Sequence, residues 1–112
     1  MKKANKSILL AMLLLSGPLV SAQSQIKYTI VGAGAISCAK YVSSAGLEQG
    51  LTVTWTQGFL SGANTQRLKS EKRVNFLPEY DFIKAYMDRY CRANPLAMYV
   101  DGAKKLSEEV LR

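Results

Sequence analysis

Histidine is absent from the 112-residue chain, and cysteine occurs only twice, as Cys38 and Cys91. Without histidine the chain lacks the usual general base near neutral pH, the serine–histidine nucleophile systems and most zinc sites. Two cysteines bonded to each other would leave no thiolate to bind a metal. These absences predict that the protein is not an enzyme and that it binds no metal and no cofactor.

Paired carboxylates, which glycosidase-type chemistry needs, are also scarce. The candidate pairs are Glu79 with Asp81, two positions apart, and Glu108 with Glu109, which are adjacent. Both pairs stand at the ends of predicted helices, where acidic residues cap the helix or face water. We therefore expect no catalytic carboxylate pair.

No hydrophobic run is long enough to cross a bilayer as a stable anchor, because the apolar stretch 8–15 falls far short of about 20 residues. This stretch follows a basic start (Lys2, Lys3 and Lys6), and Gly17-Pro18 and then Val20-Ser21-Ala22 follow it. That order is typical of a cleaved export signal. We expect a signal peptide over residues 1–22, a mature protein in the periplasm or outside the cell, and no stable membrane span.

A complete dinucleotide-binding motif is missing, although Gly32-Ala33-Gly34 follows strand-like residues. Ser37 occupies the third glycine position, and no acidic residue stands about 20 positions further on. We therefore interpret residues 23–36 as an extended arm, with the glycines as a flexible hinge before the first helix.

A strong charge of one sign is also missing once the predicted signal is removed. The formal net charge of +7 falls to +4, with 12 basic and 8 acidic residues. The densest basic stretch is Arg67, Lys69, Lys72 and Arg73, interrupted by Glu71 and placed in a predicted loop. We interpret this charge as a solvated surface, with an acidic partner or an anionic membrane surface as alternatives, and we expect no nucleic-acid partner.

Cys38 and Cys91 form an even pair in a chain predicted to enter an oxidising compartment, which favours a disulfide between them. An intermolecular bridge or reactive thiols are the alternatives. An intramolecular bond would close a loop of about 53 residues and stabilise the fold by roughly 4 kcal/mol in the chain-entropy model.

Helical spacing predicts an all-α fold, with four helices in a disulfide-linked domain over residues 37–112. The first helix begins after Ser37 and ends near Gly46, and residues 48–50 form a turn. The second helix runs from about Thr54 to Arg67. Gly58 and Gly62 lie on one of its faces, which predicts close packing of another backbone and a second helix that lies inside the bundle.

Residues 68–77 read as a loop, and Pro78 and Glu79 open the third helix. This helix is the most clearly amphipathic, with an apolar face that includes Cys91. Asn94 and Pro95 are interpreted as the N-cap and first residue of the last helix, which runs to about Leu111.

Aromatic residues are plentiful, with six tyrosines and one tryptophan in the chain. We expect most of them to build the core, and an aromatic binding groove is the alternative. The residues of this prediction are Tyr41, Trp55, Phe59, Tyr86, Tyr90 and Tyr99.

Three blocks of the chain resemble a group of small exported proteobacterial proteins of uncharacterised function. The blocks are Ser37-Cys38-x-x-Tyr41, Trp55-x-x-Gly58-Phe59-Leu60-Ser61-Gly62-x-Asn64 and Tyr90-Cys91-Arg92-Ala93-Asn94-Pro95-Leu96. The layout also resembles the HdeA/HdeB acid-stress chaperones and, more loosely, the Rap and Tai immunity proteins of type VI secretion. The resemblance implies a small exported helical protein with a single disulfide.

We therefore expect a non-enzymatic, exported protein-binding module whose partner is another protein, of the kind that serves in immunity, secretion or conjugation. An HdeA-like chaperone active at low pH is the alternative, and the protein could form a homodimer. Besides the two cysteines, the residues expected to matter are structural: Trp55, Gly58, Phe59, Gly62, Asn64, Tyr90, Asn94 and Pro95.

Overall fold

The computed structural model describes residues 29–112, so the predicted signal peptide and residues 23–28 of the predicted arm lie outside the described residues. Four helices follow one another: α2 (Cys38–Ser43), α3 (Gly46–Glu71), α4 (Tyr80–Ala93) and α5 (Tyr99–Val110). The described part contains no strand, only an isolated bridge between Ser37 and Met98. The prediction of an all-α, four-helix fold is confirmed.

Helix α2 begins as expected but ends early. The hydroxyl of Ser37 accepts a hydrogen bond from the Lys40 main-chain N–H at 3.1 Å, which makes Ser37 the N-cap. The helix ends at Ser43, where the main-chain N–H and the hydroxyl of Ser44 turn back onto the carbonyls of the last turn. Gly46, with φ of +58°, begins α3, so its predicted role in ending the first helix is wrong.

Helix α3 is much longer than predicted. Residues 48–50 form its first turn, and the strand-like alternation of residues 51–55 is helical. Five hydroxyl groups along this polar helix each donate to the carbonyl four residues earlier, so they find partners within the helix itself. The donors are Thr52, Thr56, Ser61, Thr65 and Ser70.

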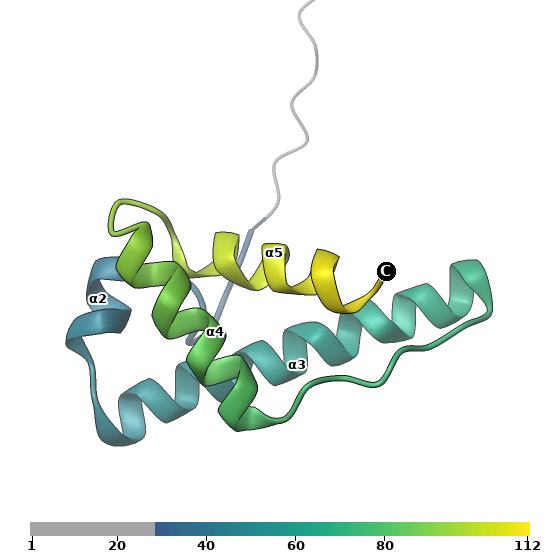
Figure 1. Ribbon diagram of the computed structural model, residues 1–112, viewed down its shortest axis with the longest axis horizontal. Helices are drawn as coiled ribbons and strands as arrows, with labels where there is room; N and C mark the ends of the chain where they lie inside the picture. Colours follow the sequence, from purple (N-terminus) through teal and green to yellow (C-terminus); the bar gives the residue numbers. More distant parts are fainter. Residues whose placement is uncertain (1–28) are drawn as a thin grey trace, which may run out of the picture.

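Only the first half of α3 contributes to the core. Its buried residues are Thr52, Val53, Thr56 and Leu60, and beyond Leu60 the helix projects away from the other helices (Figure 1). The expectation that the second helix lies inside the bundle is therefore wrong for its C-terminal half. The basic residues Arg67 and Lys69 belong to this projecting helix, not to a loop.

Helix α4 has the amphipathic face that its sequence predicts. It begins at Tyr80, two residues after Pro78, and buries Ile83, Met87 and Cys91 at intervals of four residues. Phe82, although apolar, is 53% exposed, because α2, α3 and α5 cover only the stripe beside it.

The corner between α4 and α5 differs from the prediction. Asn94 is the C-cap of α4 and does not begin α5: its main-chain N–H and its side-chain amide both donate to the Tyr90 carbonyl, at 2.9 and 2.8 Å. Pro95 stands in the turn that follows, and α5 begins only at Tyr99. The carboxylate of Asp101 accepts from the Met98 main-chain N–H at 3.1 Å and starts that helix.

The aromatic residues divide between core and rim. Tyr41 and Tyr99 are fully buried, with ring centroids 4.7 Å apart, whereas Trp55, Phe59, Tyr86 and Tyr90 are half-buried. Among residues 29–112, none of the helices combines the length and apolarity that a bilayer crossing requires.

Candidate functional site

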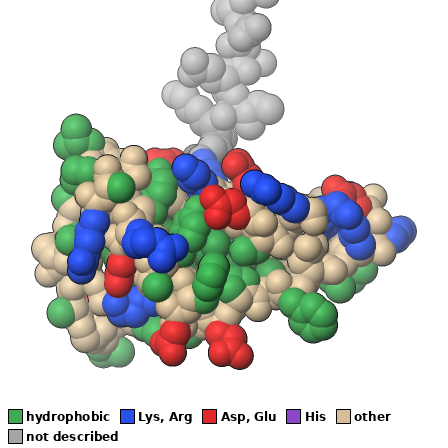
Figure 2. All heavy atoms as spheres, viewed as in Figure 1, with side chains coloured by type: hydrophobic (Ala, Val, Ile, Leu, Met, Phe, Trp, Pro, Cys, Tyr) green, Lys and Arg blue, Asp and Glu red, His purple; other side chains and the backbone are tan. Residues whose placement is uncertain are grey.

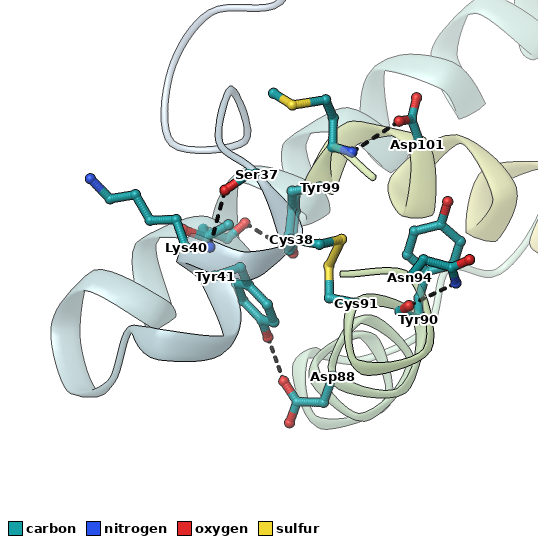
Figure 3. The surroundings of a disulfide bond; sticks show 12 residues. Ser37, Cys38, Lys40, Tyr41, Asp88, Tyr90, Cys91, Asn94, Tyr99 and Asp101 are labelled. Atoms are coloured by element: carbon teal, nitrogen blue, oxygen red, sulfur yellow. Dashed lines mark hydrogen bonds between the residues drawn. A yellow bond between two sulfur atoms is a disulfide. The ribbon is translucent and has the colours of Figure 1, made fainter. Parts of the chain in front are cut away.

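The disulfide joins the start of α2 to the last turns of α4, as predicted (Figure 3). Cys38 and Cys91 are fully buried, with Cα atoms 4.8 Å apart. The bridge between residues 37 and 98 lies alongside: the Cys38 N–H donates to the Ala97 carbonyl, and the Tyr99 N–H donates to the Ile36 carbonyl, both at 2.9 Å. This covalent and main-chain link closes the fold and offers no accessible thiol.

A polar network near the disulfide links α2 to the surface of α4. The Tyr41 hydroxyl donates to one carboxylate oxygen of Asp88 at 2.7 Å (Figure 3). The Lys84 ammonium contacts the other oxygen at 2.8 Å. Burial alone would raise the pKa of Asp88, but the hydrogen bonds from Lys84 and Tyr41 and the charges of Lys84 and Arg92 outweigh it, so this pKa lies below its usual value. Asp88 is therefore ionised at neutral pH and ties α2 to α4.

Trp55 anchors the segment before α2. Its indole N–H donates to the Val31 carbonyl at 3.0 Å, and its ring stacks on Phe59 with centroids 5.4 Å apart. Gly32 and Gly34 lie against the same ring, and a Cβ added at Gly34 would be 2.2 Å from a ring carbon. The glycines predicted to be a hinge therefore have a packing role: they let the chain pass over an indole.

Gly58 and Gly62 do not have the role that was predicted for them. Both are exposed on α3, and a Cβ at either position would meet nothing within 4 Å. The close helix contact occurs at Gly102 of α5, where a Cβ would lie 2.5 Å from a Tyr90 ring carbon and 2.7 Å from the Met87 methyl carbon. Gly102 thus brings α5 against α4.

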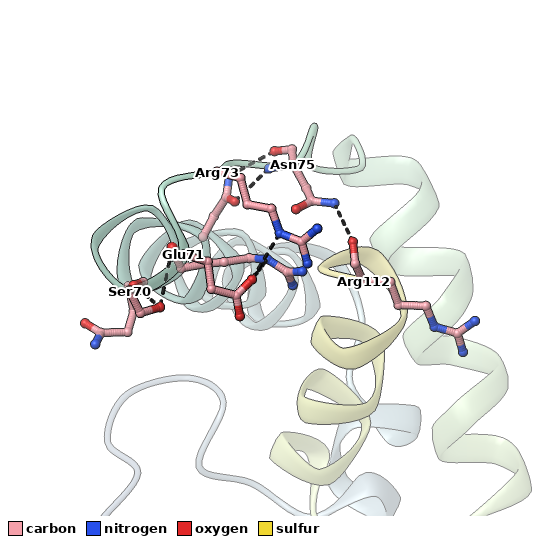
Figure 4. Close-up of polar contacts among 8 residues, drawn as sticks. Ser70, Glu71, Arg73, Asn75 and Arg112 are labelled. Atoms are coloured by element: carbon pink, nitrogen blue, oxygen red, sulfur yellow. Dashed lines mark hydrogen bonds and ion pairs between the residues drawn. The ribbon is translucent and has the colours of Figure 1, made fainter.

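Asn64 holds the segment between α3 and α4. Its side-chain oxygen accepts from the Asn75 main-chain N–H at 3.0 Å, and its amide donates to the Asn75 carbonyl at 2.9 Å. The Asn75 side chain in turn donates to the Arg112 carbonyl at 3.3 Å (Figure 4). One side chain of α3 thereby fixes both main-chain groups of a residue that stands 11 positions later.

An open groove lies between α4 and α5 beside two of the predicted residues, Tyr90 and Asn94. It has a volume of about 260 Å³. Its lining comes from Tyr86, Arg89, Tyr90, Asn94, Lys105 and Glu109, and this set defines the α4–α5 groove.

The α4–α5 groove combines aromatic walls with unpaired positive charge. The Tyr86 hydroxyl donates to Glu109 at 3.1 Å, and burial together with this hydrogen bond raises the pKa of Tyr86 to about 12, so it remains a donor at neutral pH. Arg89 and Lys105 are exposed, and neither forms an ion pair within the described residues.

This arrangement suits the recognition of a carboxylate next to an apolar or aromatic group. A guanidinium binds carboxylates through two parallel hydrogen bonds, and tyrosine rings offer flat contact area with a polar edge. The groove holds a single carboxylate, and residues 29–112 contain no cluster of three metal-ligating side chains.

The sequence contained a partial signal for this groove. Tyr86, Arg89 and Tyr90 fall within one turn of an amphipathic helix, and Lys105 and Glu109 stand four residues apart on the next helix. The periodicity of one helix does not show which face of another helix will pack against it. The sequence therefore could not predict that these residues of α4 and α5 line the same groove.

Searches of protein-family models, of curated proteins and of solved structures find no match to this sequence. The resemblance to acid-stress chaperones and to immunity proteins therefore stays a prediction.

Proposed function

We propose that the protein is an exported, non-enzymatic module that binds another protein, and that it takes an acidic segment of this partner in the α4–α5 groove. The observation that carries the proposal is the pair of unpaired cations, Arg89 and Lys105, beside the tyrosine walls of one groove. A partner that serves in immunity, secretion or conjugation would need such a fixed surface at neutral pH.

The rigidity of the groove supports this function. The disulfide holds α4 to α2, and the buried contact at Gly102 holds α4 to α5, so the groove walls are positioned before a partner arrives. Pre-organised surfaces lose less conformational freedom on binding, which favours affinity.

The test compares two charge-reversal variants of the mature, disulfide-bonded protein as baits for a periplasmic extract. Arg89→Glu/Lys105→Glu changes the groove, and Lys40→Glu/Lys69→Glu makes the same change of net charge on the exposed surfaces of α2 and α3. We expect the groove variant to bind the recovered partner at least about tenfold more weakly, and the control variant to bind it as the wild type does.

Equal recovery by the wild type and the groove variant would contradict the role of the groove. The absence of any stoichiometric partner would contradict the proposed function itself.

A second candidate function is that of an HdeA-like chaperone, and the Asp88 network favours it. Protonation of Asp88 at low pH would remove the charge that links Tyr41 of α2 and Lys84 of α4. Protonation of all eight carboxylates would also raise the net charge of the mature chain from +4 toward +12.

The test of this second function is hydrophobic-dye binding and client light scattering at about pH 2–3, the acid range in which compact, partly unfolded states form. A compact protein that leaves clients to aggregate there would exclude this function.

A further inference from the structure

The segment between α3 and α4 has the features of a single strand without a partner. Residues 72–79 return alongside the projecting half of α3 without helix or turn (Figure 1). Asn75 lies beside Asn64, and Pro78 lies beside Ser61 at a small cavity of about 100 Å³. The chain therefore runs antiparallel to the helix in an extended form.

One edge of this segment is occupied and the other is open. The N–H and the C=O of Asn75 both point to α3, where Asn64 binds them. In an extended chain the main-chain groups of alternate residues point to opposite edges, so those of Val74 and Phe76 point away from α3. Within the described residues, no hydrogen bond reaches the main chain of Val74 or Phe76.

The side chains alternate as they do in a strand with one buried face. Val74 is 60% exposed and Phe76 is fully exposed, whereas Asn75 and Leu77 are half-buried, with Leu77 lining the small cavity below. Hydrophobic side chains protrude from the surface over this segment (Figure 2). An aromatic ring displayed next to free main-chain donors and acceptors is a favourable surface for strand addition.

Positive charge at the start of this segment and a proline at its end limit what can pair with this edge. Lys72 and Arg73 stand at its start, and Pro78, which has no N–H, ends it. Arg73 and Arg67 share the single carboxylate of Glu71, at 3.0 and 3.2 Å, so this end keeps a net positive charge (Figure 4).

We propose that residues 73–77 are a docking edge, to which an extended segment of a partner protein adds in antiparallel direction. The segment it fits has apolar residues that alternate with small polar ones and contact Val74 and Phe76. Acidic residues follow at its C-terminal end, where antiparallel pairing places them beside Lys72 and Arg73. This edge is separate from the α4–α5 groove and shares no residue with it.

The experiment titrates the isotope-labelled mature protein with the synthetic peptide Ac-Thr-Val-Thr-Val-Thr-Glu-Glu-NH2 and follows amide resonances. We expect shifts at Val74, Phe76 and the Asn64 side-chain amide, and none at Arg89 or Lys105. A peptide with Lys-Lys in place of Glu-Glu should bind about tenfold more weakly, since like charges would then face each other.

Two changes test the main-chain pairing itself. Methylation of the peptide nitrogens that face the edge removes its donors and leaves every side chain in place. Phe76→Pro removes a main-chain donor of the protein together with the exposed ring, and each change should weaken binding at least about tenfold. Leu96→Ser is the matched control, because Leu96 is as exposed as Phe76 but lies in the turn between α4 and α5, and it should leave binding unchanged.

Equal binding of the methylated peptide, shifts confined to other surfaces, or no binding at all would overturn the proposal. Shifts at residues 73–77 that depend on protein concentration alone would identify a second copy as the occupant and would overturn it too. Because the groove variant Arg89→Glu/Lys105→Glu leaves this edge intact, failure of either proposal can be recognised without the other.

Discussion

Gly34 illustrates how one missing Cβ determines the packing of an aromatic ring. The Trp55 ring occupies the space that a side chain at this position would need. Because its indole N–H also binds the Val31 carbonyl, the ring cannot move without losing that hydrogen bond. Trp55 thus holds the start of the described segment before α2, and the bridge between Ser37 and Met98 holds its end.

Gly34→Ala should destabilise the protein by about 2–3 kcal/mol, since the new methyl group overlaps the ring. Denaturant unfolding measures the loss, and Trp55 fluorescence should shift toward longer wavelength. In a Trp55→Leu background the same substitution should lower the free energy of unfolding much less, since the indole ring that the new methyl group overlaps is gone. An equal cost in both backgrounds would contradict this account.

The buried hydroxyls of Thr56 and Tyr99 provide a second prediction at this scale. Their oxygens are 2.7 Å apart, and the Thr56 hydroxyl also lies 3.2 Å from the Thr52 carbonyl, whereas Tyr99 has only a longer contact of 3.4 Å to that carbonyl. Burial raises the pKa of Tyr99 to about 12, so its hydroxyl stays protonated at neutral pH.

Thr56→Val should therefore cost about 1–2 kcal/mol, because it leaves the buried Tyr99 hydroxyl poorly satisfied. Tyr99→Phe should cost about 1 kcal/mol or less, because Thr56 keeps its carbonyl partner. A double-mutant cycle by chemical denaturation checks the pair. The double variant should be more stable than the two single losses predict, and simple additivity would exclude the coupling.

At the scale of elements, the two kinds of helical glycine should respond in opposite ways to alanine. Gly58 and Gly62 lie on the open face of α3, and Gly102 lies between α5 and α4. Gly58→Ala and Gly62→Ala should each stabilise the protein by about 0.5–1 kcal/mol through helix propensity. Gly102→Ala should destabilise it by about 1–3 kcal/mol, because the methyl group meets Tyr90 and Met87. Thermal unfolding of the three variants gives the comparison. A lower stability of Gly58→Ala would mean that another backbone does pack closely at Gly58.

Helix α4 and helix α3 show why one element could be predicted and the other could not. In α4, burial at Ile83, Met87 and Cys91 follows the spacing in the sequence, because neighbouring helices cover one continuous stripe. In α3 Thr52 and Thr56 are buried, whereas the apolar side chains of Leu47 and Leu51 are exposed, so apolarity does not mark the covered face. Its hydroxyl groups bond within the helix, and Asn64 fixes the returning segment against it.

For the whole molecule, acid stability should depend on Asp88. Its pKa is lower in the folded protein than the usual value of about 3.9. A group with a depressed folded pKa stabilises the fold above the unfolded pKa, and this contribution is lost as the pH falls through the folded pKa. Stability should therefore decline below about pH 4 as Asp88 protonates.

Asp88→Asn tests this dependence across a pH series of denaturant unfolding. The variant keeps an acceptor for Tyr41 but loses the charge that faces Lys84, and should be about 1 kcal/mol less stable at pH 7. The difference between wild type and variant should shrink below about pH 4. A constant difference at every pH would contradict the role of the carboxylate charge.

The disulfide should determine whether the molecule folds at all. It closes a sequence separation of 53 residues, for which the chain-entropy model gives about 4 kcal/mol, a large share of the 5–15 kcal/mol typical of a domain. Cys38→Ala/Cys91→Ala should therefore leave a large unfolded fraction, visible by circular dichroism, and also remove partner binding. A variant as stable as the wild type would show that the helices hold together without the bond.

The sequence by itself determined the helical class, the Cys38–Cys91 pair and the buried stripe of α4. These features depend on local periodicity and on the presence of only two cysteines, and both can be seen in the sequence itself. Only the tertiary structure decided that Gly34 and Gly102 are the close contacts, that Asn94 ends a helix, and that Arg89 and Lys105 share a groove. Each of these depends on how distant segments lie against one another, and the relative placement of two helices is set by the packing of the whole core.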